Sequence, residues 1–329
     1  MTKLKLLTVL PVILALAALH SRAAAQMKVR VNWSAIAAGQ SGIWIANDEG
    51  IFKRNGLDVE LLHIPSSSRI IQTMLAGEVA ISYVDGRNSI QSNLTGSDVV
   101  MIAAVTNRFS FSLMARPEFK RVSDLKGKRI GVTRVGSSTH TAALYALNQA
   151  GLKPGDYDIL PLAEVPNILV ALMAGRIDAG PLSSPTTIRA RKAGMVELAA
   201  LAKDGPEYVS VAVGATRAYI RANEEITRRF ARSYAEAVHV FKTNKAIALR
   251  TLQKYTRVTD REILEETHNE YRQYIESIPY VSRRGVDAIL AELGTSDPKA
   301  RQAKAEDFLD MRFIAELERD GFFKKLAAK

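Results

Sequence analysis

The sequence predicts an α/β protein made of two lobes, and three features of the chain support this prediction. Strand-like and helix-like segments alternate through the first two thirds, one strand–helix–strand unit occurs twice, and the last third is helical. The chain has 329 residues, of which 47% are hydrophobic, so it is long enough for about two domains with substantial cores. We expect each lobe to be a mostly parallel sheet flanked by helices.

The first α/β unit follows from hydrophobic periodicity and turn residues. Residues 27–33 alternate apolar and polar side chains, whereas 99–105 are continuously apolar, which is typical of a strand buried on both faces. The predicted elements are a strand at 27–33, a helix from 39 to about 53, a strand at 57–61, a helix capped by Ser66, Ser67 and Ser68 and ended by Gly77, and strands at 79–84 and 99–105. Their βαβα order favours a parallel sheet with helices on both faces.

A second α/β unit repeats this pattern. Its predicted elements are a strand at 129–133, a helix from 139 to about 151, a strand at 157–162, a helix at 165–174, a strand at 177–182 and a helix that starts at Ser183-Ser184-Pro185. The junction Leu75-Ala76-Gly77-Glu78-Val79-Ala80 in the first unit corresponds to Met173-Ala174-Gly175-Arg176-Ile177-Asp178 in the second. The same Ala-Gly junction between helix and strand thus occurs in both units, which fits two lobes with the same architecture.

The last third of the chain is predicted to consist of helices that pack back on the first lobe. A long helix follows the N-cap residue Asn223, and further helices are expected at 260–275, 284–293 and 307–319. The expected organisation is a leader at 1–25, the first part of lobe 1 at 26–108, a hinge crossing at 109–116, lobe 2 at 117–205, and a second crossing with the return to lobe 1 at 206–329.

The first 25 residues have the composition of a cleavable secretory signal peptide. Lys3 and Lys5 precede the apolar run 6–19, and Ala23-Ala24-Ala25 supplies the small residues of a cleavage site. The apolar run is shorter than the roughly 20 residues that span a bilayer, which favours cleavage over a retained anchor. The chain has no cysteine, so it has neither a disulfide nor the acylated cysteine of a lipoprotein. We expect a soluble, periplasmic protein.

The formal net charge is +11, and three of the positive charges lie in residues 1–25, so the secreted chain carries +8. A basic balance can indicate nucleic acid, a membrane surface or anionic ligands. Lys and Arg are spread along the predicted helices and mixed with Asp and Glu, without a dense basic block interleaved with aromatic residues. Most of them fit a solvated surface, no nucleic-acid partner is expected, and a modest bias toward small anionic ligands remains.

Three segments together resemble a known family. The segment Asp124-Leu125-Lys126-Gly127-Lys128-Arg129-Ile130-Gly131-Val132 resembles the start of the second lobe in type-II periplasmic solute-binding proteins of ABC importers. The segments 50–59 and 74–80 are similar to two earlier junctions of the nitrate, sulfonate and taurine class, which includes pyrimidine-precursor binders. The resemblance covers essentially the whole secreted chain. It implies a monomeric receptor that closes on a small, anionic organic solute of the sulfonate, taurine, nitrate or aromatic carboxylate type and delivers it to a membrane permease with its ATPase.

The candidate ligand site lies in the loops between strands and helices. Ligands of open α/β sheets lie beyond the carboxyl ends of the strands, where helix N-termini present unpaired N–H groups. Two such loops in each lobe carry hydroxyl or amide side chains, and these could equally be plain helix caps. The candidates are Gln40, Ser41, Ser67 and Ser68 in the first lobe and Ser137, Ser138, Thr139 and Ser184 in the second.

Four further candidates follow strand ends. Trp33 could stack on a ligand or belong to the core, and Asp85 could hold a ligand amine or merely cap the next helix. Asn107 follows the fourth strand, and Arg134 follows the strand of the family segment, where a guanidinium could hold a sulfonate or carboxylate.

The motifs of the common enzyme classes are not found in the sequence. There is no cysteine nucleophile, no Gly-x-Ser-x-Gly elbow, no His-Glu-x-x-His and no Walker-type phosphate loop. Glu265 and His268 are three residues apart on a predicted helix, a spacing that can supply half of the ligands of a metal site. The sequence contains no second such pair. We expect no catalytic residue, no metal and no cofactor. The alternatives are an enzyme of the same fold in pyrimidine or menaquinone-precursor metabolism, and a binding protein that serves a sensor instead of a permease.

Overall fold

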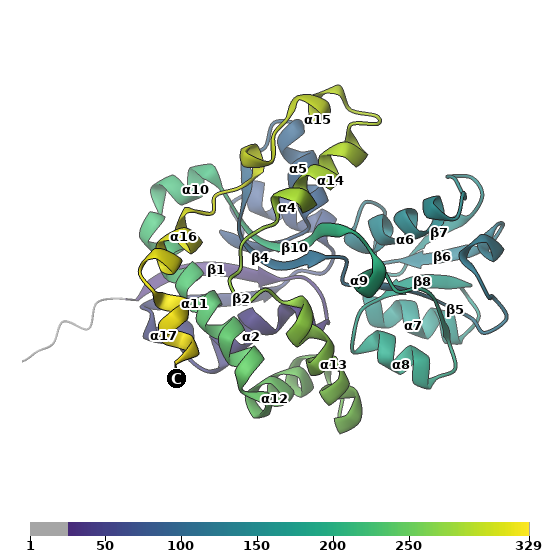
Figure 1. Ribbon diagram of the computed structural model, residues 1–329, viewed down its shortest axis with the longest axis horizontal. Helices are drawn as coiled ribbons and strands as arrows, with labels where there is room; N and C mark the ends of the chain where they lie inside the picture. Colours follow the sequence, from purple (N-terminus) through teal and green to yellow (C-terminus); the bar gives the residue numbers. More distant parts are fainter. Residues whose placement is uncertain (1–25, 329) are drawn as a thin grey trace, which may run out of the picture.

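The computed structural model describes residues 26–328 and shows two lobes, each built around a five-stranded sheet (Figure 1). The first sheet has the order β2-β1-β3-β10-β4, from β1 (Met27–Trp33), β2 (Leu57–His63), β3 (Ile81–Val84), β4 (Val99–Arg108) and β10 (Glu207–Thr216). The second has the order β7-β6-β8-β5-β9, from β5 (Ser112–Ala115), β6 (Arg129–Val132), β7 (Asp158–Pro161), β8 (Ala179–Leu182) and β9 (Val196–Ala199). The two-lobed α/β prediction is confirmed.

Each sheet is mixed, with one strand that runs against the other four. In the first sheet this strand is β10, which pairs antiparallel with β3 and β4. In the second it is β5, which pairs antiparallel with β8 and β9. Both are the first strands after the chain has crossed between lobes, so each enters its sheet from the opposite end. The sheets are therefore mostly but not wholly parallel.

Helices flank both sheets. The first lobe has α2 (Ser41–Asp48), α3 (Ile51–Arg54), α4 (Ser67–Leu75) and α5 (Gly86–Leu94), and the second has α6 (Ser138–Gln149), α7 (Val165–Met173), α8 (Thr186–Lys192) and α9 (Leu201–Asp204). The C-terminal third adds α10 (Arg217–Ala222), α11 (Glu224–Thr243), α12 (Lys245–Thr256), α13 (Arg261–Tyr274), α14 (Arg283–Leu293), α15 (Pro298–Gln302), α16 (Arg312–Arg319) and α17 (Phe322–Ala327). Short 3-10 turns occupy η2 (Ala38–Gln40), η3 (Val122–Leu125) and η4 (Ala305–Phe308).

Two helix predictions need correction. The helix expected from 39 to 53 is divided into η2, α2 and α3, and α3 begins after Gly50, whose φ of 66° lies in the left-handed region. The helix expected at 307–319 begins only at Arg312, because the preceding residues form η4 and an extended segment.

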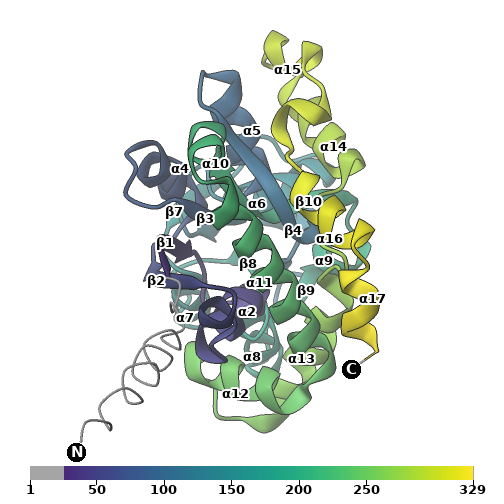
Figure 2. The ribbon, with the colours of Figure 1, turned by 90° about the vertical axis from the view of Figure 1, so that its left-hand side faces the viewer.

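The C-terminal helices pack on the first lobe, as predicted. α11 lies against α2 (Figure 2), and its side chains Phe230, Tyr234, Val238 and Phe241 are buried in the core of that lobe. This is the apolar face that helical spacing indicates. The C-terminal region therefore completes the first lobe rather than forming a third unit.

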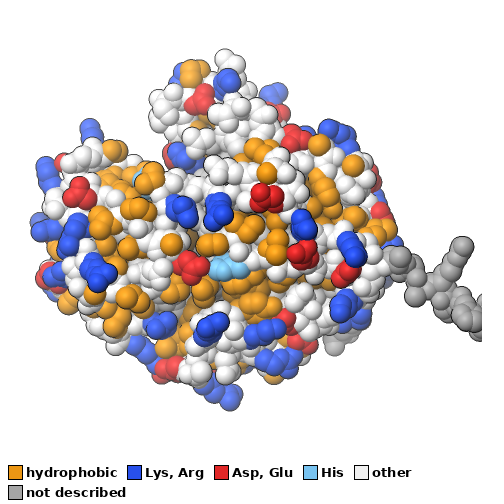
Figure 3. All heavy atoms as spheres, turned by 180° about the vertical axis from the view of Figure 1, so that it is seen from behind, with side chains coloured by type: hydrophobic (Ala, Val, Ile, Leu, Met, Phe, Trp, Pro, Cys, Tyr) orange, Lys and Arg blue, Asp and Glu red, His pale blue; other side chains and the backbone are white. Residues whose placement is uncertain are grey.

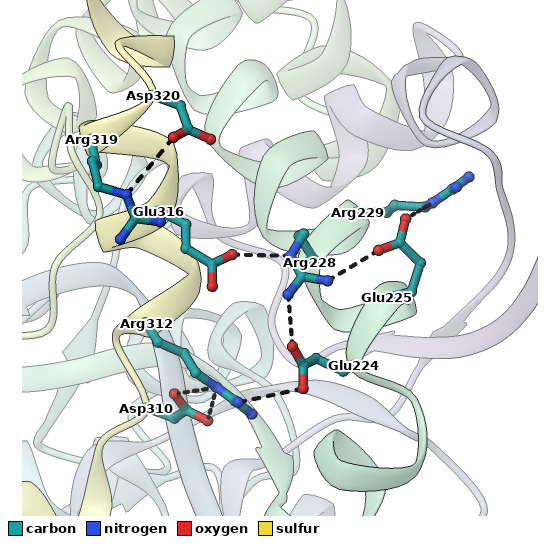
Figure 4. Close-up of polar contacts among 9 residues, drawn as sticks. All are labelled: Glu224, Glu225, Arg228, Arg229, Asp310, Arg312, Glu316, Arg319 and Asp320. Atoms are coloured by element: carbon teal, nitrogen blue, oxygen red, sulfur yellow. Dashed lines mark hydrogen bonds and ion pairs between the residues drawn. The ribbon is translucent and has the colours of Figure 1, made fainter.

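A charge network ties α16 to α11 (Figure 4). Arg228 contacts Glu224 at 2.7 Å, Glu225 at 3.1 Å and, on α16, Glu316 at 3.0 Å. Arg312 reaches Glu224 from the other side at 3.5 Å. These carboxylates raise the pKa of Arg228 above its ordinary value. Although exposed ion pairs contribute little one by one, several that share partners hold the last helices in place.

The chain passes between the two sheets twice. β4 ends at Arg108 and β5 begins at Ser112, while β9 ends at Ala199 and β10 begins at Glu207. The two long strands β4 and β10 run side by side and pair from Glu207↔Arg108 onward (Figure 1). At this junction Phe109 stacks on Tyr208 with a centroid distance of 4.2 Å. Two neighbouring strands thus carry the connection between the lobes.

The two glycines of the segment that resembles the family have different structural roles. Gly127 has a φ of 72°, as the turn before β6 requires. Gly131 lies within β6, where a Cβ atom would come within 2.5 Å of Ile177.

The positive charge is dispersed over the visible surface. On the face shown in Figure 3, Lys and Arg side chains are scattered among acidic and hydrophobic ones. This agrees with the mixed charge pattern of the sequence.

Candidate functional site

A cavity lies between the two lobes, with walls contributed by both. Its volume is about 50 Å³. Its polar wall residues are Ser34, Gln40, Ser66, Ser67 and Asp85 from the first lobe, Ser110 and Ser210 from the crossings, Thr133, Ser138, Thr139, Glu164 and Ser183 from the second lobe, and Tyr271 from α13. Its apolar wall residues include Ile36, Pro65, Val84, Phe111, Val165 and Val211. A compact solute with polar groups and an apolar body suits such walls.

The lobes touch one another around this cavity, so the structure is a closed arrangement. The Ser138 N–H donates to the Ser67 Oγ atom across the cleft at 3.1 Å. The Ala38 N–H donates to the Ser184 carbonyl oxygen at 3.1 Å. At a third point His63 Nε2 lies 3.8 Å from Glu164 Oε1.

Ion pairs between α8 and α13 form a further contact between the lobes. Arg191 Nη1 lies 3.4 Å from Glu266 and 3.4 Å from Glu270. Lys192 Nζ lies 3.2 Å from Asp260 and 2.6 Å from Glu262. The basic end of α8 therefore faces an acidic helix of the other lobe.

Five of the predicted ligand residues line the cavity: Gln40, Ser67, Asp85, Ser138 and Thr139. They come from three strand-to-helix loops of the first lobe and one of the second. The Gln40 Oε1 atom accepts the Ser34 N–H at 3.0 Å, which leaves its amide N–H groups for the cavity. The Thr139 hydroxyl is nearly buried and accepts the Thr133 N–H at 2.9 Å.

The other seven predicted residues do not line this cavity. Trp33 stacks on His63 at 3.8 Å, and Ser41 is buried at the start of α2. Ser68 faces the Ser66 hydroxyl, Asn107 fastens the backbone of Tyr280 and Ser282, and Arg134 is exposed. Ser137 caps α6, and Ser184 bonds Glu270 beside a separate polar cavity. Their contact with a ligand stays a prediction.

The N-terminus of α6 is already capped by hydroxyl groups. The Ser137 Oγ atom accepts the His140 N–H at 3.4 Å, and Ser67 of the other lobe accepts the Ser138 N–H. Plain helix capping, one of the two readings of this loop, therefore accounts for Ser137. In this closed arrangement the His140 N–H is used by the helix cap, and the Ser138 N–H is used by the contact between the lobes.

Several cavity residues were missed in the sequence. Ser183, Ser210 and Tyr271 are each at most 2% exposed; within residues 26–328 the Ser210 hydroxyl has no hydrogen-bond partner, and the hydroxyls of Ser183 and Tyr271 have only one another. Ser183 precedes the predicted Ser184 in the same loop, so the sequence indicated this loop but a different serine. Ser210 lies inside a strand and Tyr271 on a C-terminal helix, where no local pattern indicates a ligand contact. Unpaired buried hydroxyls facing a cavity are natural partners for a bound solute.

Backbone strain occurs at matching points of the two lobes. Ser66 has a φ of 75° and Ala163 a φ of 69°, both unusual for residues with a side chain. Ser66 follows β2 and Ala163 follows β7, and both line the cavity. Each such conformation costs about 1–3 kcal/mol and persists where the surroundings impose it, which is common at ligand sites.

Asp85 is the most perturbed acid of the site. Its side chain caps α5 by accepting the Asn88 N–H at 3.0 Å. Burial, opposed by that hydrogen bond and by the Arg87 charge, raises the pKa of Asp85 to about 7. The carboxyl group can therefore gain or lose its proton near neutral pH.

The described residues contain no cluster of His, Cys, Asp and Glu that could hold a metal ion. The spacing of Glu265 and His268 does not produce one. His268 is buried with Nε2 2.9 Å from the Phe241 carbonyl, while Glu265 pairs with Lys245 and Arg261. Between residues 26 and 328 no helix is both long and apolar enough to cross a bilayer.

The chain is similar to bacterial binding proteins over most of its length. A candidate binding protein of Brucella abortus is 29% identical over 283 residues, which cover 84% of this chain and 87% of the relative. The taurine-binding periplasmic protein of Escherichia coli is 26% identical over 208 residues, covering 62% of this chain and 63% of that protein.

The fold is similar to that of a solved periplasmic binding protein. The periplasmic nitrate-binding protein of Synechocystis PCC 6803 superposes with a TM-score of 0.74 at 11% identity, over 90% of this chain and 89% of that structure. A model of the family described as NMT1/THI5 like matches residues 38–245. Because this match covers more than half of the chain, the protein belongs to the NMT1/THI5-like family.

Proposed function

We propose that the protein binds a small organic solute in the cavity between its lobes and delivers it to the permease of an ABC importer. The cavity between the lobes, lined by loops of both lobes that the sequence singled out, is the observation that carries this function. The taurine and nitrate binders named above support it, because they are periplasmic binding proteins.

The role of the protein is to bind without chemistry. The three relatives described above are named for binding, and the cavity contains hydroxyl groups, amides and two carboxyl groups rather than an activated nucleophile beside a base. We infer a monomer that reaches the periplasm through the predicted signal peptide. That peptide occupies residues 1–25 and lies outside the described residues.

The test is a thermal-shift screen of the wild-type protein and of Ser138→Trp. Solutes for the screen are taurine, nitrate, alkanesulfonates, aromatic carboxylates, pyrimidines and simple amines. A solute present at 100 times its Kd stabilises the folded state by about 2.7 kcal/mol. Ser138→Trp fills the cavity beside Ser67 and should lose the shift entirely.

The matched control is Ser123→Trp, an exposed serine of the same lobe. It should keep the wild-type shift. Equal shifts in all three proteins would place the solute elsewhere, and no shift with any compound would count against the function itself.

A further inference from the structure

The charged residues of the cavity wall are all acidic. They are Asp85 and Glu164, and no Lys, Arg or His belongs to the described lining. The guanidinium of Arg87, whose charge acts on Asp85 from outside the lining, donates to Glu292 Oε1 at 2.8 Å and to Gln91 Oε1 at 2.9 Å. Arg134, the cation that the sequence offered for an anionic ligand, is exposed and outside the cavity. A bound anion would therefore find no countercharge in the wall.

Asp85 is buried without a neutralising partner. Its residue is 3% exposed, and it makes no ion pair with any residue between 26 and 328. The groups that face it are Arg87 on its own helix, Glu292 on α14 and Tyr208 on β10, with His140 of α6 next to Arg87. A helix cap alone does not require a buried acid, because asparagine caps as well as aspartate.

Buried hydroxyl groups around the cavity supply an independent sign of a ligand: that of Ser210 has no hydrogen-bond partner within residues 26–328, and those of Ser183 and Tyr271 have only one another. Ser183, Ser210 and Tyr271 face the cavity from β8's end, β10 and α13, and each is at least 98% buried. An unpaired buried hydroxyl is costly, and a solute that bonds it removes that cost. The polar groups are thus distributed around the space, with the carboxyl of Asp85 at the start of α5.

We propose that the solute carries a protonated nitrogen group, an amine or amidine, which binds the Asp85 carboxylate, on a compact and largely apolar body. The body packs against Ile36, Pro65, Val84, Phe111, Val165 and Val211. The hydroxyl groups of Ser183, Ser210 and Tyr271 bond the remaining polar atoms. This assignment rests on the proposed solute-binding function and names the class of solute.

A cationic solute and an anionic solute should show opposite pH dependences of the binding affinity. A cation binds the ionised carboxylate, so binding releases the proton that Asp85 holds at lower pH. An anion needs Asp85 to be protonated, so its binding weakens as that proton is lost. Since Asp85 titrates near pH 7, the affinity for a cation rises about tenfold from pH 6 to pH 8, and the affinity for an anion falls by a similar factor.

The experiment compares matched probes by calorimetry at pH 6, 7 and 8. The probes are propylamine, benzylamine and benzamidine, the carboxylates and sulfonates on the same carbon frames, and the corresponding neutral amides and alcohols. The amines and amidine should bind with the rising pH profile. Asp85→Asn should weaken them by roughly a hundredfold and abolish the profile, because a buried charged hydrogen bond loses its acceptor charge.

The control is Asp297→Asn, which changes another capping aspartate at an exposed helix start away from the cavity. It should bind like the wild type. Tighter binding of the carboxylates or sulfonates, retained in Asp85→Asn, overturns the proposal and leaves the solute-binding function intact. If the earlier screen finds another solute, a falling pH profile for that solute overturns the proposal as well. Binding of no compound by the folded protein overturns the function too.

Discussion

The Asp85 carboxylate, which we propose binds the solute, lowers the stability of the folded protein. In the closed arrangement its carboxyl group is buried beside Arg87, Glu292 and Tyr208, all of the first lobe, and burial raises its pKa to about 7. The unfolded chain releases the same proton near the ordinary aspartate value of 3.8. Between these two values the folded state holds a proton that the unfolded state has lost. The acid therefore lowers the stability as the pH rises from about 4 to about 7.

Replacing this residue should change the pH dependence of stability. Asp85→Asn keeps a capping side chain but cannot ionise. The free energy of unfolding of the variant minus that of the wild type should therefore increase as the pH rises. Each pH unit corresponds to about 1.4 kcal/mol at most, so the two units between pH 5 and the pKa near 7 correspond to roughly 3 kcal/mol. Urea unfolding of both proteins at pH 5 and pH 8, without solute, measures this difference. A constant difference at the two pH values would mean that Asp85 is ionised in the folded protein.

At the residue scale the sequence indicates which loops form the site but not which side chains turn inward. Gln40, Ser67, Asp85, Ser138 and Thr139 follow from the rule that ligands lie at strand ends. The neighbours of these residues carry the same chemical groups, and only the local backbone decides between them. Tyr271 comes from a helix about 130 residues after Ser138, and only tertiary packing brings it to the cavity.

At the element scale, strands buried on both faces and helices with a clear apolar face were predicted close to their observed bounds. The strands β5, β9 and β10 were missed. β5 and β9 have four residues each, too few for a period to show, and β10 follows the crossing between the lobes. Each antiparallel strand pairs with strands that lie far from it in the sequence, β10 with β3 and β4 and β5 with β8 and β9, and no local pattern predicts such pairing.

The start of α5 depends on a close approach to β10. A Cβ atom on Gly86 would lie 2.5 Å from the Val209 carbonyl oxygen and 2.9 Å from its Cβ atom. Both contacts involve the backbone or its first side-chain atom, so neither can move aside easily. Because Asp85 precedes Gly86 and Ser210 follows Val209, this contact also sets the spacing of two cavity residues.

Gly86→Ala should therefore separate α5 from β10 and lower the free energy of unfolding by about 1–3 kcal/mol. It should also weaken solute binding, since Asp85 and Ser210 would move apart. Denaturant unfolding and calorimetry measure the two effects. Gln72→Ala, at an exposed position of the neighbouring helix α4, is the control and should stay within about 0.5 kcal/mol of the wild type. If Gly86→Ala leaves the free energy of unfolding and the solute affinity unchanged, β10 can move away from α5 without a loss of stability, which contradicts this prediction.

On the scale of the whole molecule, the lobes form separate sheets but share one connection and one closed interface. The connection is made by β4 and β10, which pair from Arg108 and Glu207 onward. The interface combines single hydrogen bonds such as Ser138 to Ser67, the ion pairs between α8 and α13, and a limited apolar contact in which Ile188 of α8 packs on the core of the first lobe. Such contacts are weak enough to break, so we expect the lobes to open without solute and to close around it.

The most direct test measures the distance across the cleft with and without solute. Because the chain contains no cysteine, Arg69→Cys and Val135→Cys can be labelled with spin probes without background, and both positions are exposed. They flank the contact between Ser67 and Ser138 from opposite lobes. We predict a long, broad distance distribution in the free protein that collapses to a single short distance when the solute is added, and no collapse in the Ser138→Trp background. A distribution that is the same with and without a tightly bound solute would contradict closure around the cavity.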